Sequence, residues 1–89
     1  MKRTKLTFFE WLMVLFGYTY LMNESSGEVH FLPQKTANCG IDKMKRKNKI
    51  YLNANDYADV LKRGYRRTKN GGYVLVNGCV WCNRADDKG

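Results

Sequence analysis

The small set of soft metal ligands is the feature that most constrains how this chain can fold. Its 89 residues include three cysteines and one histidine, which together make a single Cys₃His set. The set consists of His30, Cys39, Cys79 and Cys82. A chain this short buries a limited share of its surface, so a metal that joins distant segments would add stability that the core alone does not supply. The sequence therefore predicts a fold around one tetrahedral metal ion with a structural role.

Cys79 and Cys82 have the spacing of a zinc knuckle. Two thiolates at this spacing, after a strand and an Asn-Gly turn, can bind one ion while backbone amides donate to the sulfurs. Thiolates with one imidazole favour Zn²⁺, although iron suits the same ligands. The alternative for this Cys-x-x-Cys is a redox pair, but such pairs open a helix, whereas a short polar tail follows here. For His30 the alternative is an ordinary half-buried histidine with no ligand role.

The odd number of thiols also bears on the cellular setting. Three cysteines cannot all pair within one chain, and no small-residue cleavage site follows the first apolar run. These observations disfavour a secreted domain held by disulfides. We therefore expect a cytoplasmic protein whose thiols hold a metal.

The amino-terminal segment, residues 1–24, is basic at its start and then apolar. The apolar run, residues 6–22, is short for a membrane span and includes Glu10. Thr7 and Glu10 have the spacing of a capping box, which predicts a helix of water-soluble type over residues 8–21. Because this helix is apolar almost all round, we expect a second copy, a partner protein or a membrane surface to cover part of it. The side chains predicted to make that contact are Trp11, Leu12, Leu15 and Phe16.

Residues 28–84 have the pattern of a small α+β unit, and residues 85–89 are predicted to form a polar tail. Asn53 and Gly64 are typical helix caps, and an amphipathic stripe lies between them. Short β-rich runs predict strands at residues 28–32, 49–52 and 73–76, with turns at residues 23–27 and 77–78. The predicted fold class is α+β: a small zinc-stabilised domain of short strands and one amphipathic helix, preceded by the apolar helix.

Positive charge is the second strong feature of the sequence. Sixteen Lys and Arg against eight Asp and Glu give a formal net charge of +8. The excess lies between Lys35 and Lys69, which predicts contacts to the phosphates of a nucleic acid. The predicted phosphate contacts are Lys43, Lys45, Arg46, Lys47, Lys49, Lys62, Arg63, Arg66, Arg67 and Lys69. The aromatic residues that could stack on bases are Tyr51, Tyr65, Tyr73 and Trp81. The alternative is a plain solvated surface.

The order of these residues resembles the zinc domain of the bacterial Ada methyl-phosphotriester repair family, and more closely its Ada-like modules whose first ligand is a histidine. The resemblance covers about residues 28–84. It rests on His30, Cys39, the strand at residues 49–52, the stretch from Ala58 to Arg66, and the Cys79-x-x-Cys82 pair. The resemblance implies a zinc ion held by these four ligands and, as the chemistry known for the family, a zinc thiolate that accepts an alkyl group.

Two departures from the family pattern affect what can be transferred. The gap between the first two ligands is longer here, and residues 67–78 separate the Gly-Tyr-Arg stretch from the cysteine pair. This insertion predicts an added hairpin or loop. The leading apolar helix lies outside the resemblance.

Three functional hypotheses follow from these patterns. The leading one is a small basic zinc module that binds nucleic acid and is not an enzyme, because a single histidine held by metal leaves no free histidine as a general base. The alternative is a protein-interaction module, such as a phage or mobile-element accessory factor that docks on a host complex. The third, implied only by the resemblance, is the zinc-thiolate alkyl acceptor.

Overall fold

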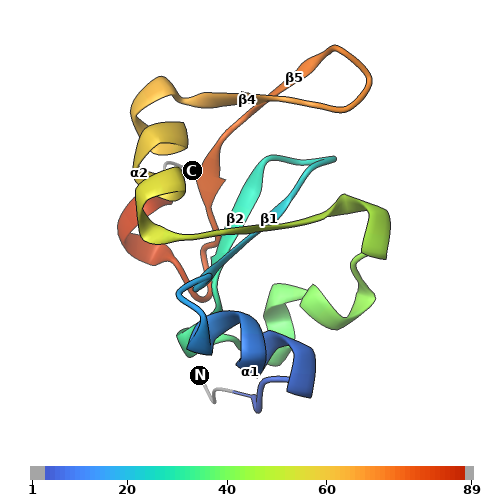
Figure 1. Cartoon of the computed structure of the whole chain (residues 1–89), viewed down its shortest axis with the longest axis vertical. Coiled ribbons are helices and arrows are strands. Elements are labelled where there is room, and N and C mark those ends of the chain that lie inside the picture. The colour runs from blue at the N-terminus through green and yellow to red at the C-terminus, as the bar shows by residue number, and fades with distance from the viewer. Residues whose placement is uncertain (1–3, 88–89) are drawn as a thin grey trace.

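A four-stranded sheet in the order β3-β1-β2-β6 lies at the centre of the computed structural model, which describes residues 4–87 (Figure 1). β1 (Tyr20–Asn23) pairs antiparallel with both β2 (Glu28–Phe31) and β3 (Lys49–Leu52). β6 (Asn77–Gly78) adds to β2 in parallel. Together with two α-helices, α1 (Phe8–Leu15) and α2 (Ala54–Arg63), these strands give the described residues the predicted α+β class.

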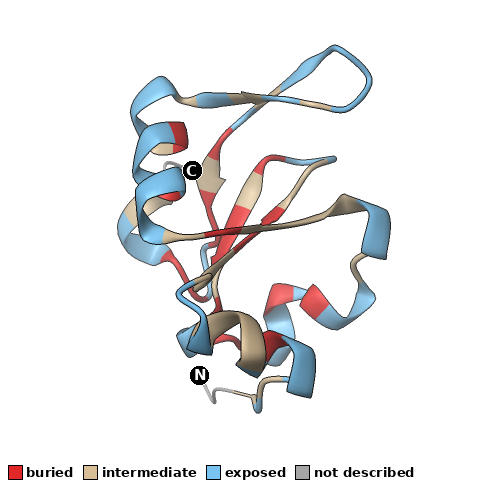
Figure 2. Ribbon diagram, in the orientation of Figure 1, coloured by how far each residue is buried: buried red, intermediate tan, exposed pale blue. Residues whose placement is uncertain are grey.

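Both faces of this sheet are buried. Leu21 and Met22 of β1 point to opposite faces, since side chains alternate along a strand, and both are 0% exposed. The Leu21 face carries a cluster that includes the three cysteines, and Val14 of α1 packs against it. The Met22 face carries a second cluster, which α2 covers with Tyr57 and Val60. Figure 2 shows the buried residues concentrated on the strands and on the segments beside them.

α1 begins with the predicted capping box, and the carboxylate of that box also anchors the helix. The Glu10 amide donates to Thr7 Oγ1 at 3.2 Å, and the Thr7 amide donates to Glu10 Oε1 at 2.9 Å. Lys35 Nζ lies 2.9 Å from Glu10 Oε1 and 2.8 Å from Asp42 Oδ1. Glu10 and Lys35 are 1% and 2% exposed. Lys35 is therefore a buried anchor of α1, although the sequence places it at the start of the basic stretch.

α1 ends earlier than predicted, and the helix predicted over residues 8–21 is wrong beyond Leu15. Gly17 has a φ of +94°, and the Tyr18 amide donates to Met13 O at 2.8 Å. This left-handed glycine and the hydrogen bond that spans it form a Schellman motif, which terminates a helix. The following residues then enter β1. No helix within residues 4–87 is long and apolar enough to cross a membrane.

α2 agrees with the sequence pattern at both ends. The Asn53 side chain accepts from the backbone amide three residues later at 2.7 Å, and Gly64 ends the helix with a φ of +80°. Its buried Tyr57 reaches the segment predicted as a polar tail, because Tyr57 Oη donates to Asp86 Oδ2 at 2.6 Å. Residues 84–86 form a 3₁₀ turn against this helix, and residues 88–89 lie outside the described range.

A two-stranded hairpin extends from the end of α2. β4 (Tyr65–Arg67) pairs antiparallel with β5 (Tyr73–Leu75), which confirms the hairpin or loop predicted for residues 67–78. The strand predicted at residues 73–76 stops one residue early. The predicted turn at residues 77–78 is wrong, because these residues pair with β2 as β6. The pairing of β6 with β2 needs glycine at position 78, because a Cβ there would lie only 2.5 Å from Asn83 O.

Candidate metal centre

Three separate parts of the chain bring the four predicted ligands into one buried cluster. His30 lies on β2, and Cys39 ends the 3₁₀ turn at residues 37–39. Cys79 and Cys82 belong to the turn that follows β6. All four residues are buried, and together they form a group that could hold a metal ion. The predicted ligand set therefore comes together in space.

Hydrogen bonds to β2 fix the turn that carries the cysteine pair. The Cys79 amide donates to Val29 O at 2.8 Å, which continues the parallel pairing of β6 with β2. The Asn83 amide donates to Cys79 O at 2.8 Å and closes the turn. The Asn83 side chain, which is also buried, donates to Val29 O at 3.3 Å and to Tyr57 Oη at 2.9 Å. The sheet and α2 thus hold the cysteine turn in place from two sides.

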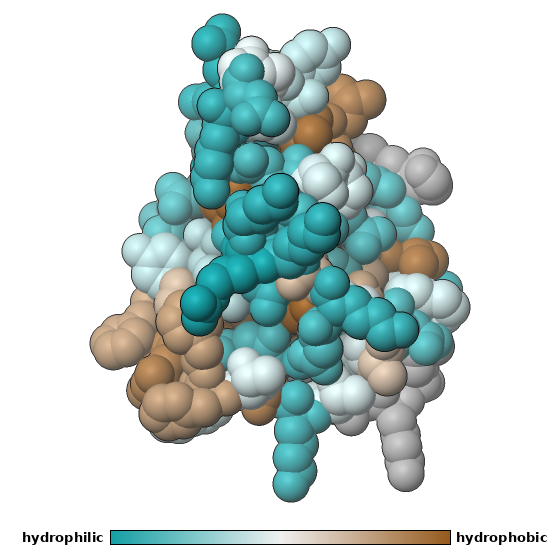
Figure 3. Space-filling model, turned by 90° about the vertical axis from the view of Figure 1, so that its right-hand side faces the viewer, coloured by the Kyte–Doolittle hydropathy of each residue, from teal (hydrophilic) through white to brown (hydrophobic). Residues whose placement is uncertain are grey.

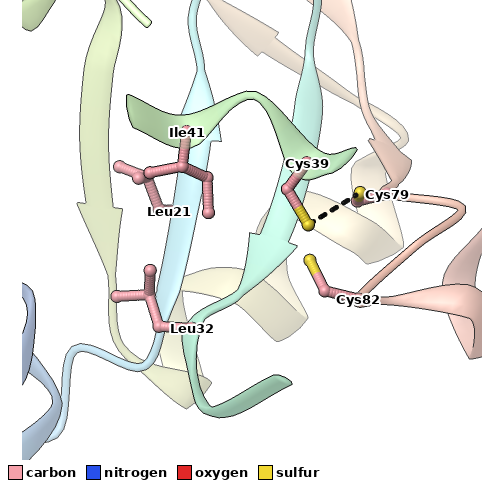
Figure 4. Packing of buried hydrophobic residues seen from close by; sticks show 6 residues of the cluster. All are labelled: Leu21, Leu32, Cys39, Ile41, Cys79 and Cys82. Atoms are coloured by element: carbon pink, nitrogen blue, oxygen red, sulfur yellow. Dashed lines mark hydrogen bonds between the residues drawn. The ribbon is translucent and has the colours of Figure 1, made fainter. Parts of the chain in front are cut away.

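Two of the distances within the cluster equal the edges of a tetrahedron around a metal ion. The four ligand atoms lie within 4.8 Å of one another. Cys39 Sγ is 3.8 Å from Cys79 Sγ, and His30 Nδ1 is 3.6 Å from Cys82 Sγ. A tetrahedral ion bound to sulfur at about 2.3 Å and to nitrogen at about 2.05 Å separates two sulfurs by about 3.8 Å, and sulfur from nitrogen by about 3.6 Å. Figure 4 shows the three sulfurs turned toward one another, and the 3.8 Å between Cys39 and Cys79 is far longer than a disulfide bond, so these cysteines are free thiols.

Each sulfur accepts a hydrogen bond from a backbone amide. Cys39 accepts from Thr36 at 3.4 Å, Cys79 from Trp81 at 3.4 Å, and Cys82 from Phe31 at 3.3 Å. The Thr36 hydroxyl lies 3.3 Å from Cys39 Sγ as a further partner. Such bonds delocalise the negative charge of a metal-bound thiolate and fix the direction of its lone pairs.

The histidine ring is positioned at both of its nitrogens. Nδ1 of His30 faces Cys82 Sγ, while Nε2 lies 3.3 Å from Glu28 Oε1. A carboxylate that accepts from the outer nitrogen holds the ring in the tautomer whose Nδ1 lone pair can bind a metal. The sequence interpretation did not include Glu28. Its position two residues before His30 on the same strand is the signal that could have identified it, because such residues share a face.

Burial favours the uncharged forms of these side chains. Burial raises the pKa of the Cys79 thiol and that of the Cys82 thiol above their ordinary values, because a thiolate loses its hydration there. Burial lowers the pKa of His30 to about 4, so its imidazole is neutral at pH 7. A neutral imidazole is ready to bind metal, whereas the thiols lose their protons in this interior only if a positive ion takes their place.

The ten predicted phosphate contacts all reach the surface, and they spread over more than one side of the molecule. Lys49 and Arg66 are half-buried, and the other eight are exposed. Figure 1 shows the carboxyl end of α2 and the 3₁₀ turn Arg46–Asn48 at opposite sides, with the β4–β5 hairpin extending across the top of the view from the end of α2. Lys69 Nζ donates to Lys47 O at 3.3 Å, which ties the hairpin tip to that turn. Two arginines have acidic neighbours: Arg63 lies 3.0 Å from Asp59, and Arg66 lies 3.9 Å from Glu24.

α1 leaves a group of large hydrophobic side chains uncovered within this chain. We call this group the α1 patch; it consists of Phe8, Phe9, Trp11, Leu15 and Phe16, which are between 51% and 74% exposed. Three of the four predicted contact residues belong to it, and Leu12 is half-buried instead. Phe8 and Phe9 were not among the predicted contacts. In Figure 3 this hydrophobic area lies at the lower left, and hydrophilic side chains cover the middle of the same view.

Comparison with family models, with curated proteins and with solved structures found no match for this chain. The resemblance to Ada-like zinc domains therefore stays a prediction. The case for a metal centre rests on the four ligands and on the geometry described above.

Proposed function

We propose that the Cys₃His cluster binds one Zn²⁺ and that the ion is structural. The donor set and the two printed separations of tetrahedral length support zinc, which prefers this geometry with sulfur and nitrogen ligands. When bound, the ion supplies the positive charge that stabilises the buried thiolates. It would also join β2, the Cys39 turn and the cysteine pair, three segments far apart in the sequence.

The burial of the sulfurs supports a structural role over the alkyl-acceptor hypothesis. Cys39 is the most exposed of the three at 8%, while Cys79 and Cys82 are 0% and 1% exposed. A thiolate that attacks an alkylated phosphate needs room for the substrate at its sulfur. Elemental analysis of protein purified without added metal should find one zinc per chain. A finding of stoichiometric iron would contradict the zinc assignment, and a metal-free protein of native stability would contradict the metal centre itself.

We infer that the metal-bound protein binds nucleic acid through its phosphates. The observation that carries this proposal is the exposure of the predicted basic residues, with one hydrogen bond from Lys69 at the hairpin tip to Lys47 in the Arg46–Asn48 turn. Three thiolates and one Zn²⁺ change the net charge by one unit, so the metal-bound chain still carries about +7. A field of one sign on so small a surface attracts polyanions.

Salt dependence tests the nucleic-acid proposal directly. Fluorescence anisotropy measures how the zinc-loaded protein binds a labelled oligonucleotide from low to physiological salt. The affinity should fall steeply as salt rises, because each phosphate contact releases a counterion. The logarithm of the association constant should fall linearly with the logarithm of the salt concentration. Absence of binding at low salt to both single-stranded and duplex probes would contradict the proposal.

The α1 patch favours a second candidate function, the binding of a protein partner. Five large hydrophobic side chains on one helix exceed what isolated surface residues explain. This candidate and nucleic-acid binding are compatible, because the patch and the hydrophilic area occupy different parts of the surface in Figure 3. Binding to a protein through this patch should persist at high salt, which distinguishes it from phosphate contacts.

A further inference from the structure

The two faces of the β4–β5 hairpin differ in what they contact. Side chains directly opposite each other on paired strands share a face, and Arg66 pairs with Val74. Both are half-buried, and this inner face lies on the β1–β2 turn, where a Cβ at Gly27 would collide with the Leu75 carbonyl oxygen. The hairpin is therefore packed onto the sheet by one face, which leaves its other face free.

The outer face carries two tyrosines, an arginine and a leucine. The register pairs Tyr65 with Leu75 and Arg67 with Tyr73, so these four side chains share that face. Tyr65 is 45% exposed and Tyr73 is 69% exposed, and their ring centroids lie 6.1 Å apart at an interplanar angle of 76°. Two aromatic rings this close together on a surface offer a base one ring face for stacking and one ring edge for a T-shaped contact.

Two surface hollows meet along this face. One, of about 370 Å³, is lined by Tyr65, Arg67, Gly71, Gly72 and Tyr73. The other, of about 320 Å³, is lined by Val60, Arg63, Tyr65, Arg66 and Arg67. Tyr65 and Arg67 border both hollows, and the second also reaches Arg66 of the inner face and the end of α2. No carboxylate is among the residues that line the two hollows, although Asp59 pairs with Arg63 and Glu24 lies 3.9 Å from Arg66.

Aromatic and cationic side chains in alternation match the chemistry of a single strand of nucleic acid. Its bases are free to stack on aromatic rings, and its phosphates follow a positively charged groove. In a duplex the base faces are already stacked, so exposed tyrosines gain little from it. A protein segment would have to be acidic to match the three arginines, and it would leave the stacking faces of the rings unused.

We propose that the outer face of the β4–β5 hairpin binds single-stranded nucleic acid, with bases on Tyr65 and Tyr73 and phosphates on Arg67 and Arg63. This proposal rests on the nucleic-acid function proposed above and specifies its ligand. The two glycines at the hairpin tip leave the rim of the Tyr73 hollow without side chains, so that a strand can pass over it.

The test measures anisotropy with labelled oligothymidylate and oligouridylate of about fifteen nucleotides, a length within the site size of small strand-binding domains. A duplex of the same length is measured in parallel. The variants are Tyr65→Ala, Tyr73→Ala and the matching phenylalanine replacements, with Asn55→Ala on α2 as an exposed control outside both proposed surfaces. Metal content and circular dichroism establish that each variant is folded.

Each alanine variant should lose between about fivefold and one hundredfold in affinity for the single strands. The phenylalanine variants should bind like the parent, because they keep the aromatic face, and so should Asn55→Ala, because it leaves both tyrosines in place. Equal binding of strand and duplex with no effect of the tyrosine variants would overturn this inference and leave the phosphate-binding function standing. Failure of the parent to bind any probe at low salt would overturn both.

Discussion

The buried ring of His30 lies between a cysteine sulfur and the Glu28 carboxylate, which fix its orientation from two sides. We expect Glu28→Ala to weaken Zn²⁺ binding about 10- to 100-fold, because the outer ring nitrogen loses its acceptor and the ring loses its preferred tautomer. Glu28→Gln should weaken it less, since the amide oxygen still accepts. Competition with a chromophoric chelator measures the affinity.

The control for this prediction is Asp59→Asn, which removes an exposed carboxylate on α2 that pairs with Arg63. Its zinc affinity should equal that of the parent. An effect of Glu28→Ala no larger than that of the control would show that the carboxylate does not position the ligand.

The members of the buried Cys₃His cluster were predictable from the sequence, whereas their surroundings were not. One histidine and three cysteines leave little choice of set, so His30 and Cys39 could be assigned without knowing how far apart they lie. The hydrogen bonds of Glu28 and Thr36 to the cluster were not predicted, because they depend on the direction in which a strand and a turn face. Residue type gives the chemistry of the ligands, and tertiary structure decides the hydrogen bonds around them.

At the scale of elements, a buried ion pair decides where α1 sits. Lys35→Met should destabilise the fold by about 3–5 kcal/mol, because Glu10 then remains as an unpaired buried charge. The double variant Glu10→Gln with Lys35→Met should recover much of that loss, since glutamine retains the capping box and no charge is left buried. Urea unfolding followed by circular dichroism gives the free energies. A double variant as unstable as the single one would contradict this account.

The α1 patch predicts association of the protein. Sedimentation should find a dimer or a stable complex with a partner, and Trp11→Glu or Leu15→Glu should dissociate it, because a charge at a buried contact lacks a partner. Leu75→Glu serves as the control, since Leu75 is 70% exposed on the hairpin, away from α1. A parent protein that stays monomeric at high concentration would contradict the prediction.

Element lengths show where sequence patterns fail. The caps of α2 were identifiable because Asn53 and Gly64 act locally. The end of α1 was missed because β1 is buried on both faces, and such a strand shows the same continuous apolar run as a buried helix. β6 was missed for a similar reason: an Asn-Gly pair is typical of turns, and only its pairing with β2 makes it a strand.

For the molecule as a whole, removal of the metal should unfold the half that carries the cysteine pair. Metal binding to such a site is coupled to folding, so a strong chelator should abolish the dispersion of amide signals from residues around the cluster. Zinc added back at neutral pH should restore them. Acidification should release the metal as well, because protons compete for thiolates and imidazole. Signals unchanged by chelation would contradict a structural metal.

The charge distribution makes a further prediction at this scale. Arg67→Glu should weaken binding to all nucleic-acid sequences alike and should lower the slope of the salt dependence by about one, as the loss of a phosphate contact does. Arg84→Glu is the matched control, because Arg84 is exposed and lies outside the predicted set. Equal effects of the two reversals would show that only net charge matters and that no surface is specified.

The short distance between the sulfurs of Cys39 and Cys79 has a topological consequence. Cys39 and Cys79 are 40 positions apart in sequence and 3.8 Å apart at their sulfurs. Every basic residue assigned to phosphate contacts lies between them. A metal at this point closes the basic segment into a loop tied at its base, and it thereby fixes the spacing of the positive charges. Without the metal the same charges would sit on an open chain with variable spacing, so metal supply would govern how well the protein matches the regular phosphate repeat of a nucleic acid.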